Sequence, residues 1–205
     1  MPTIVALGDS TTAGTPGFQS PIEAPPEGAG DVRSQYAYWL TQAHPDWRVL
    51  NRGVNGERSD QIRARFARDV ITAGADVVVV VAGVNDVYQG RTAAQVEREL
   101  EAIYDAARAA SIPLVAGSII PYNTATPEQN AAMHAVNRWI AAHAAAHAVS
   151  MVFCDTRAAV AAPGSPDLLV SSPDDLHPSP EGYRLMAMAL EPAIAAALAK
   201  ARALR

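Results

Sequence analysis

The strongest constraint on the fold is a regular alternation of short β-branched runs with long, alanine-rich amphipathic runs. This alternation is typical of βαβ units, in which helices connect parallel strands. The run DVVVVVAG at residues 76–83 is apolar at successive positions, which predicts a central strand that is buried on both faces. The chain is therefore expected to fold as an α/β protein with a parallel sheet.

Individual elements follow from the same pattern. Five strands are predicted, at Thr3–Leu7, Trp47–Asn51, Asp76–Val81, Leu114–Ile119 and Val149–Phe153. Five helices are predicted, near residues 34–44, 60–73, 93–110, 127–147 and 180–203. Capping-box spacing at Thr92 and Thr126 and N-cap residues at Ser59 and Ser179 indicate four of the helix starts. Pro192 predicts a kink or break at Glu191 in the last helix.

Composition narrows the classes of protein. The 205 residues fit a single domain over 1–205, and no apolar run approaches the roughly 20 residues of a membrane span. A net charge of −5 without a basic tract argues against a nucleic-acid partner. The lone Cys154 forms no internal disulfide, and the absence of a visible secretory signal favours the cytoplasm, although a secreted form with its signal removed has the same pattern. Nothing in the sequence predicts an oligomeric state.

Small polar residues follow the first three predicted strands. They are Gly8-Asp9-Ser10, Asn51 to Gly56, and Ala82 to Asp86. Ligands of open α/β sheets bind outside the carboxyl ends of the strands, where strand order reverses. In a five-stranded sheet of order 2-1-3-4-5 these three loops are neighbours, so we expect the functional site there.

A fourth polar segment, SPDDLHPSPEGY, lies near the end of the chain. Asp174 and His177 are three residues apart, close enough for a carboxylate to hold one imidazole nitrogen while the other faces elsewhere. A serine hydroxyl is a poor nucleophile until such a base takes its proton. The order Ser, Asp, His along the chain is what acyl transfer by a serine nucleophile needs.

These blocks resemble the GDSL esterase/lipase superfamily, also called the SGNH hydrolases. The resemblance covers most of the chain and rests on four ordered motifs, GDSTT, NRGVNGE, GVND and DDLHP, with Thr11 in place of the usual Leu. It implies a flavodoxin-like three-layer α/β/α sandwich. It also implies that Ser10 is the nucleophile, His177 the general base and Asp174 its orienting carboxylate, with the oxyanion held by the N–H groups of Ser10 and Gly56 and the amide of Asn85.

The function expected on this basis is that of a serine carboxylester hydrolase without metal or organic cofactor. Its substrate would be a small-molecule or carbohydrate ester with a short acyl or acetyl group. Removal of acetyl groups from carbohydrates, lysophospholipase or thioesterase activity, and acyl transfer to an alcohol are alternatives with the same triad. We expect the walls of the substrate site to include Val84, Val87, Tyr88, Tyr122 and Asn123.

Other interpretations compete with these at single positions. Asp175 stands where relatives often have Gly, and it is the rival of Asp174 for orienting His177. A Ser/Thr-rich loop after the first strand also suits the phosphate of FMN, which makes a flavodoxin-like binding module the rival class. The long segment 15–33 is either a flap beside the site or a surface excursion.

Three further groups of residues are interpreted structurally. The HAAAH pair, His143 and His147, has zinc-like spacing but no third ligand, so it is expected to be an ordinary helix face. Asp155 is expected to cap a turn or helix. A solvated helix face is predicted for the arginines Arg58, Arg63, Arg65 and Arg68, which alternate with acidic residues.

Overall fold

Strand β5 (Val77–Val81) lies at the centre of a five-stranded parallel sheet of order β4-β1-β5-β6-β7. The other strands are β1 (Thr3–Gly8), β4 (Arg48–Gly53), β6 (Leu114–Gly117) and β7 (Met151–Cys154). Counting only these five, the order is 2-1-3-4-5, as predicted. The computed structural model describes residues 1–203, so Leu204 and Arg205 of the expected 1–205 domain lie outside the described residues.

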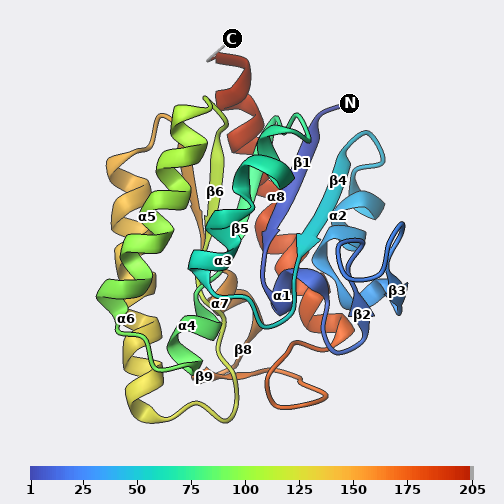
Figure 1. The fold of residues 1–205 in the computed structure, drawn as a ribbon. Helices are drawn as coiled ribbons and strands as arrows, with labels where there is room; N and C mark the ends of the chain where they lie inside the picture. Colours follow the sequence, from blue (N-terminus) through green and yellow to red (C-terminus); the bar gives the residue numbers. More distant parts are fainter. Residues whose placement is uncertain (204–205) are drawn as a thin grey trace.

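Both faces of the sheet are covered, because side chains alternate along the central strands. Val5 and Leu7 of β1 pack into one hydrophobic cluster, whereas Ile4 and Ala6 pack into the other. Helices α3 (Ser59–Ala64), α5 (Ala93–Ala109) and α6 (Pro127–Ala146) cover the first face. Helices α2 (Tyr36–Ala43) and α8 (Pro180–Ala203) cover the second (Figure 1). The expected three-layer α/β/α sandwich is confirmed.

Short elements connect these layers. The short helices are α1 (Ser10–Ala13), α4 (Val84–Tyr88) and α7 (Thr156–Val160), with a 3₁₀ turn at Val32–Ser34 and a π-helical turn at Ala67–Ile71. Two antiparallel hairpins pair β2 (Phe18–Gln19) with β3 (Ala29–Gly30) and β8 (Ala161–Ala162) with β9 (Ser165–Leu169). Helices α1 and α4 lie at the carboxyl end of the sheet, the lower edge in Figure 1, where the polar loops meet.

Two helix predictions are wrong in detail. The helix expected over 60–73 is divided, because α3 ends at Ala64 and a separate π-helical turn follows it. Ser59 is the first helical residue rather than the N-cap, and its Oγ donates to Asp86 Oδ1 at 2.7 Å. Helix α8 is not broken at Glu191, since it continues through Pro192, which lies on the exposed side of the helix where water can hydrate the freed carbonyl; the alternative, a kink at this point, stays a prediction.

The other helix starts agree with the expected caps. Thr126 and Gln129 form the reciprocal capping box at the start of α6, and Gln95 Oε1 accepts the N–H of Thr92 before α5. Ser179 Oγ accepts the N–H of Gly182 at 3.3 Å at the start of α8. Among residues 1–203, no helix is both long enough and apolar enough to span a bilayer.

Candidate active site

Ser10 is presented by a tight turn from β1 into α1. Asp9 is the N-cap of α1, and its Oδ1 accepts the N–H of Thr11 at 3.0 Å. Gly8 permits the turn, because a Cβ at this position would lie 2.2 Å from Thr12 Oγ1 and 2.3 Å from the Val81 carbonyl oxygen. The buried Ser10 is therefore fixed at the carboxyl edge of the sheet, next to the centre.

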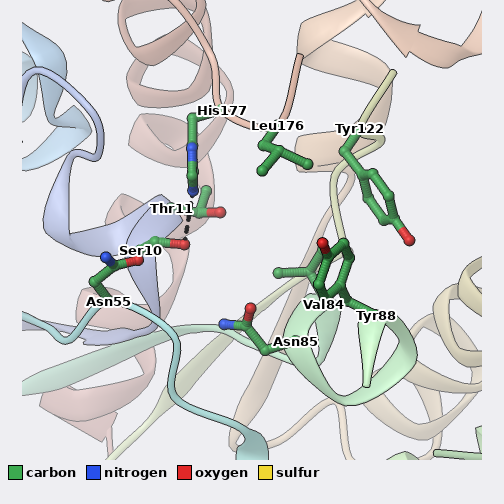
Figure 2. Close-up of a pocket in the computed structure, with 9 residues that line it drawn as sticks. All are labelled: Ser10, Thr11, Asn55, Val84, Asn85, Tyr88, Tyr122, Leu176 and His177. Carbon is green, nitrogen blue, oxygen red and sulfur yellow. Dashed lines mark hydrogen bonds between the residues drawn. The ribbon is translucent and has the colours of Figure 1, made fainter. Parts of the chain in front are cut away.

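His177 lies directly against this serine, although 167 residues separate the two in the sequence. Its Nε2 is 2.9 Å from Ser10 Oγ, and its Nδ1 is 2.7 Å from Asp174 Oδ2. Because an ionised carboxylate only accepts, Nδ1 carries the ring hydrogen and Nε2 is free to accept the Ser10 hydroxyl proton. A serine hydroxyl, an imidazole and a carboxylate thus form one hydrogen-bonded chain, as a serine nucleophile with an oriented base requires. Figure 2 shows the contact between His177 and Ser10.

Asp174 is held for this task by its own neighbours. Its Oδ1 accepts the backbone N–H groups of Leu176 at 3.1 Å and His177 at 2.8 Å. Partial burial raises the pKa of this carboxyl group, but the hydrogen bonds from the side chain and backbone of His177 and from Leu176 outweigh it and lower the pKa below its usual value. Asp174 is therefore ionised wherever the histidine works as a base.

Asp175 contacts a different partner, so the contact to His177 belongs to Asp174 alone. Its Oδ1 accepts Asn123 Nδ2 at 3.0 Å, and its carbonyl oxygen accepts the Asn123 N–H at 2.8 Å. Its φ of 62° lies in the left-handed region, which favours Gly and which Asp tolerates better than most residues.

The loop that carries His177 returns from the edge of the sheet through a chain of contacts. After β7 the chain forms α7 and the β8–β9 hairpin, where Asn123 Oδ1 accepts the Leu169 N–H at 2.8 Å. Asn123 thus connects the end of β9 with Asp175. It does not line the pocket beside Ser10, so its expected role as a substrate wall is not met, and it positions the His177 loop instead.

Candidate oxyanion donors lie on the other side of Ser10. Asn85 Nδ2 donates one hydrogen to the Glu57 carbonyl oxygen at 2.9 Å, which leaves a second amide hydrogen available. Gly56 has a φ of 77°, and its N–H has no hydrogen-bond partner within residues 1–203. Two neutral donors are therefore fixed close to one another in the loop that follows β4 and at the start of α4.

A pocket opens beside Ser10, with a volume of about 160 Å³. Its walls are Ser10, Thr11, Asn55, Val84, Asn85, Tyr88, Tyr122, Leu176 and His177 (Figure 2). Val84, Tyr88 and Tyr122 were expected here and are found, whereas Val87 is buried in the hydrophobic core and does not line the pocket. Asn55 was missed, although it directly precedes Gly56 in the loop predicted to carry a donor.

Segment 15–33 lies beside the site, although none of its residues lines the pocket. It packs against the loop that carries Asn55 instead. Ser20 Oγ donates to the Gly53 carbonyl oxygen at 2.6 Å, and Glu23 Oε1 accepts the Asn55 N–H at 2.8 Å. The segment therefore supports the loop that carries Gly56 from outside.

Arg65 contradicts the expectation of a solvated arginine face. Its side chain is only 7% exposed, whereas those of Arg63 and Arg68 are 49% and 65% exposed.

Two other residue groups were also interpreted structurally. Asp155 caps α7, with Oδ1 accepting the Ala158 N–H at 3.0 Å. His143 and His147 stack one turn apart on and just after α6, and residues 1–203 contain no group of three or more His, Cys, Asp or Glu arranged to hold a metal ion.

Comparisons with known proteins agree with this geometry. A search of curated proteins finds no match. Among solved structures, a G-D-S-L family protein from Desulfitobacterium hafniense DCB-2 superposes with a TM-score of 0.77 at 21% identity, covering 94% of this chain and 99% of that one. A G-D-S-L family member from Veillonella parvula DSM 2008 gives 0.77 at 20% identity, covering 93% and 96%.

An acetylxylan esterase from Geobacillus stearothermophilus, solved as a catalytic mutant, gives a TM-score of 0.73 at 22% identity, covering 94% of each chain. At these identities the structural neighbours establish the fold alone. The sequence itself gives the family, because residues 6–185 match the GDSL-like lipase/acylhydrolase family. This match spans the turn at Ser10, the Gly56 loop, Asn85 and the Asp174–His177 pair, and the chain therefore belongs to the GDSL-like lipase/acylhydrolase family.

Proposed function

We propose that this protein is a serine carboxylester hydrolase that acts through an acyl-enzyme on esters with short acyl groups. One observation carries the proposal, the hydrogen-bonded chain from Ser10 Oγ through His177 to Asp174, with contacts of 2.9 and 2.7 Å. In a flavodoxin-like binding module the Ser10 hydroxyl would instead serve a phosphate, and the contact with His177 would have no purpose. The membership of the family favours the hydrolase.

The reaction proceeds in two halves. Ser10 Oγ attacks the ester carbonyl carbon while His177 Nε2 takes the hydroxyl proton, and the tetrahedral intermediate forms with its negative charge on the former carbonyl oxygen. The N–H groups of Ser10 and Gly56 and the amide of Asn85 stabilise that charge. Collapse of the intermediate breaks the bond to the alcohol, which leaves with the proton from His177.

Water completes the cycle. His177 Nε2 takes a proton from a water molecule, whose oxygen attacks the acyl-enzyme carbonyl, and a second tetrahedral intermediate releases the acid and returns the proton to Ser10. Asp174 keeps the ring in one orientation and stabilises the imidazolium in both halves. If an alcohol replaces water at this step, the same acyl-enzyme yields a new ester.

The dimensions of the pocket support a short acyl group. A volume of about 160 Å³ is below the roughly 300–1,000 Å³ that encloses drug-sized ligands. Val84, Tyr88 and Leu176 give it an apolar wall, as an acetyl to butyryl chain requires. The fold shared with an acetylxylan esterase makes acetylated carbohydrates a specific candidate, with lysophospholipids and thioesters as alternatives.

The test is hydrolysis of p-nitrophenyl esters from acetyl to palmitoyl by wild type and by Ser10→Ala. We expect a maximum at the short esters and a loss of several orders of magnitude in Ser10→Ala. A rate unaffected by Ser10→Ala would overturn the serine mechanism. A maximum at palmitoyl would overturn the short-chain assignment and favour lipids, whereas acetylxylan, a lysophospholipid and an acyl thioester, assayed side by side, identify the alcohol or thiol portion.

A further inference from the structure

The Arg65 side chain is hydrogen-bonded to three segments of the candidate active site: the end of β1, the end of β4 and the loop that carries Gly56 and Glu57. It directly follows α3, and its buried guanidinium has an acceptor for each of its three nitrogens. Nη2 donates to the Gly8 carbonyl oxygen at 2.8 Å, Nη1 to the Arg52 carbonyl oxygen at 2.7 Å and to Asp69 at 2.6 Å, and Nε to Glu57 at 2.7 Å. A planar guanidinium holds such acceptors in a fixed relative geometry.

Two of these acceptors are carbonyl oxygens at the ends of neighbouring strands that lead into the candidate site. Gly8 is the last residue of β1 and precedes Asp9 and the nucleophile Ser10. Arg52 lies near the end of β4, the neighbouring strand, which leads into the Gly56 loop. One side chain therefore ties the turn that presents the nucleophile to the loop that presents the oxyanion donors.

The contact with Glu57 reaches the donors most directly. Glu57 follows Gly56, and its carbonyl oxygen accepts one hydrogen of the Asn85 amide. A displacement of Glu57 would therefore also displace the Gly56 N–H and the Asn85 amide. Its carboxylate, 19% exposed, is gripped by Arg65 Nε and sets where this residue lies.

We propose that Arg65 is a positioning residue that acts through Glu57 on the oxyanion hole. The inference rests on the proposed function, in which Gly56 and Asn85 stabilise the intermediate. The competing interpretation is purely structural, because Arg65 also forms a buried ion pair with Asp69. The two interpretations of Arg65 predict different effects of a change at Glu57, because removing the Glu57 carboxylate leaves the Arg65–Asp69 ion pair intact.

Glu57→Ala is therefore the principal variant, and Arg65→Lys is the second, which keeps a positive charge beside Asp69 but loses the planar fork. Glu99→Ala is the matched control. It breaks the 2.7 Å ion pair between Glu99 and Arg63, an exposed arginine of α3, the helix that Arg65 directly follows. Kinetics on p-nitrophenyl acetate and inhibition by an arylboronic acid are measured for each. The boronate forms a tetrahedral adduct on Ser10 Oγ that resembles the intermediate.

For Glu57→Ala and Arg65→Lys we expect kcat to fall about 10–100-fold with KM within about threefold, since a small misplacement of catalytic groups costs this much. The boronate inhibition constant should rise by a similar factor. Glu57→Gln, which still accepts a hydrogen bond from Arg65, should recover part of the loss, and Glu99→Ala should behave as wild type. In an Asn85→Ala background the effect of Glu57→Ala should shrink, because the share that acts through Asn85 is already lost and only the share that acts through Gly56 remains.

A wild-type kcat in Glu57→Ala, with or without a lower melting temperature, would overturn the inference and leave the proposed function intact. So would an undiminished effect of Glu57→Ala in the Asn85→Ala background. Equal rates for wild type and Ser10→Ala would overturn the proposed function, and this inference with it. If Arg65→Lys does not fold, Glu57→Ala decides the question by itself.

Discussion

Asp9 lies beneath the nucleophile in an apolar setting, and replacing it should change how stability depends on pH. The side chain is 1% exposed, and its Oδ2 has no hydrogen-bond partner within residues 1–203. Burial raises the pKa of Asp9 from 3.8 to about 7, against the opposing hydrogen bonds from Thr11 and the charge of Arg65, with Asp86 adding to the rise. The carboxyl group is therefore partly protonated near neutral pH.

The sign of the effect follows from proton binding. Between 3.8 and about 7 the native state holds a proton on Asp9 that the unfolded chain has released. This contribution to stability is complete below 3.8 and is lost as the pH rises through about 7. A difference of about 3 pH units corresponds to about 4 kcal/mol of unfolding free energy.

Asp9→Asn removes the titration while it keeps an oxygen for the Thr11 N–H. We therefore expect the unfolding free energy of Asp9→Asn, minus that of wild type, to increase by about 4 kcal/mol between about pH 4 and pH 8.5. Urea unfolding followed by circular dichroism at several pH values measures this difference. Asp46→Asn, at an exposed position, is the control and should follow wild type throughout. A difference between Asp9→Asn and wild type that does not change with pH would refute the reasoning.

Three predictions concern catalysis, all measured on p-nitrophenyl esters. Asp174→Asn should lower kcat about 10⁴-fold, as loss of the orienting carboxylate does in a triad, whereas Asp175→Asn should stay within about threefold of wild type because that side chain contacts Asn123. Equal losses at the two positions would contradict the assignment. Asn85→Ala should lower kcat about 10²–10³-fold with little change in KM, and a change in KM alone would remove Asn85 from the oxyanion hole. Tyr88→Ala should raise kcat/KM for octanoyl relative to acetyl esters about tenfold, because the exposed ring closes one side of the acyl pocket, and an unchanged ratio would place the chain elsewhere.

Sequence reasoning predicted the sheet and the loops that carry the candidate site residues, because the signals for both are local and ordered. The run of valines at 77–81 fixes a doubly covered strand, and the turn residues after it fall at the carboxyl edge of a parallel sheet. The spacing of Asp174 and His177 favours their contact, because two residues three positions apart in one tight loop can reach each other. Only the resemblance to the family predicted that this loop reaches Ser10.

The errors involve partners that are distant in the sequence. Arg65 was assigned to a solvated face because its neighbours alternate in charge, but its acceptors include the carbonyl oxygens of Gly8 and Arg52, which no local pattern indicates. Asn123 does not line the pocket as expected, because its side chain is hydrogen-bonded to Asp175 and to the Leu169 N–H of β9. Val87 was misplaced for a different reason, since the short helix that puts it on the buried face of α4 was not predicted.

Covalent trapping of the nucleophile tests the central claim most directly. A fluorophosphonate transfers its phosphonyl group to an activated serine oxygen with loss of fluoride, and mass spectrometry of the digested protein locates the adduct. The account predicts a single adduct on Ser10, formed in parallel with loss of esterase activity and absent from Ser10→Ala. Loss of activity with the adduct on another residue, or full activity after complete labelling of Ser10, would contradict it.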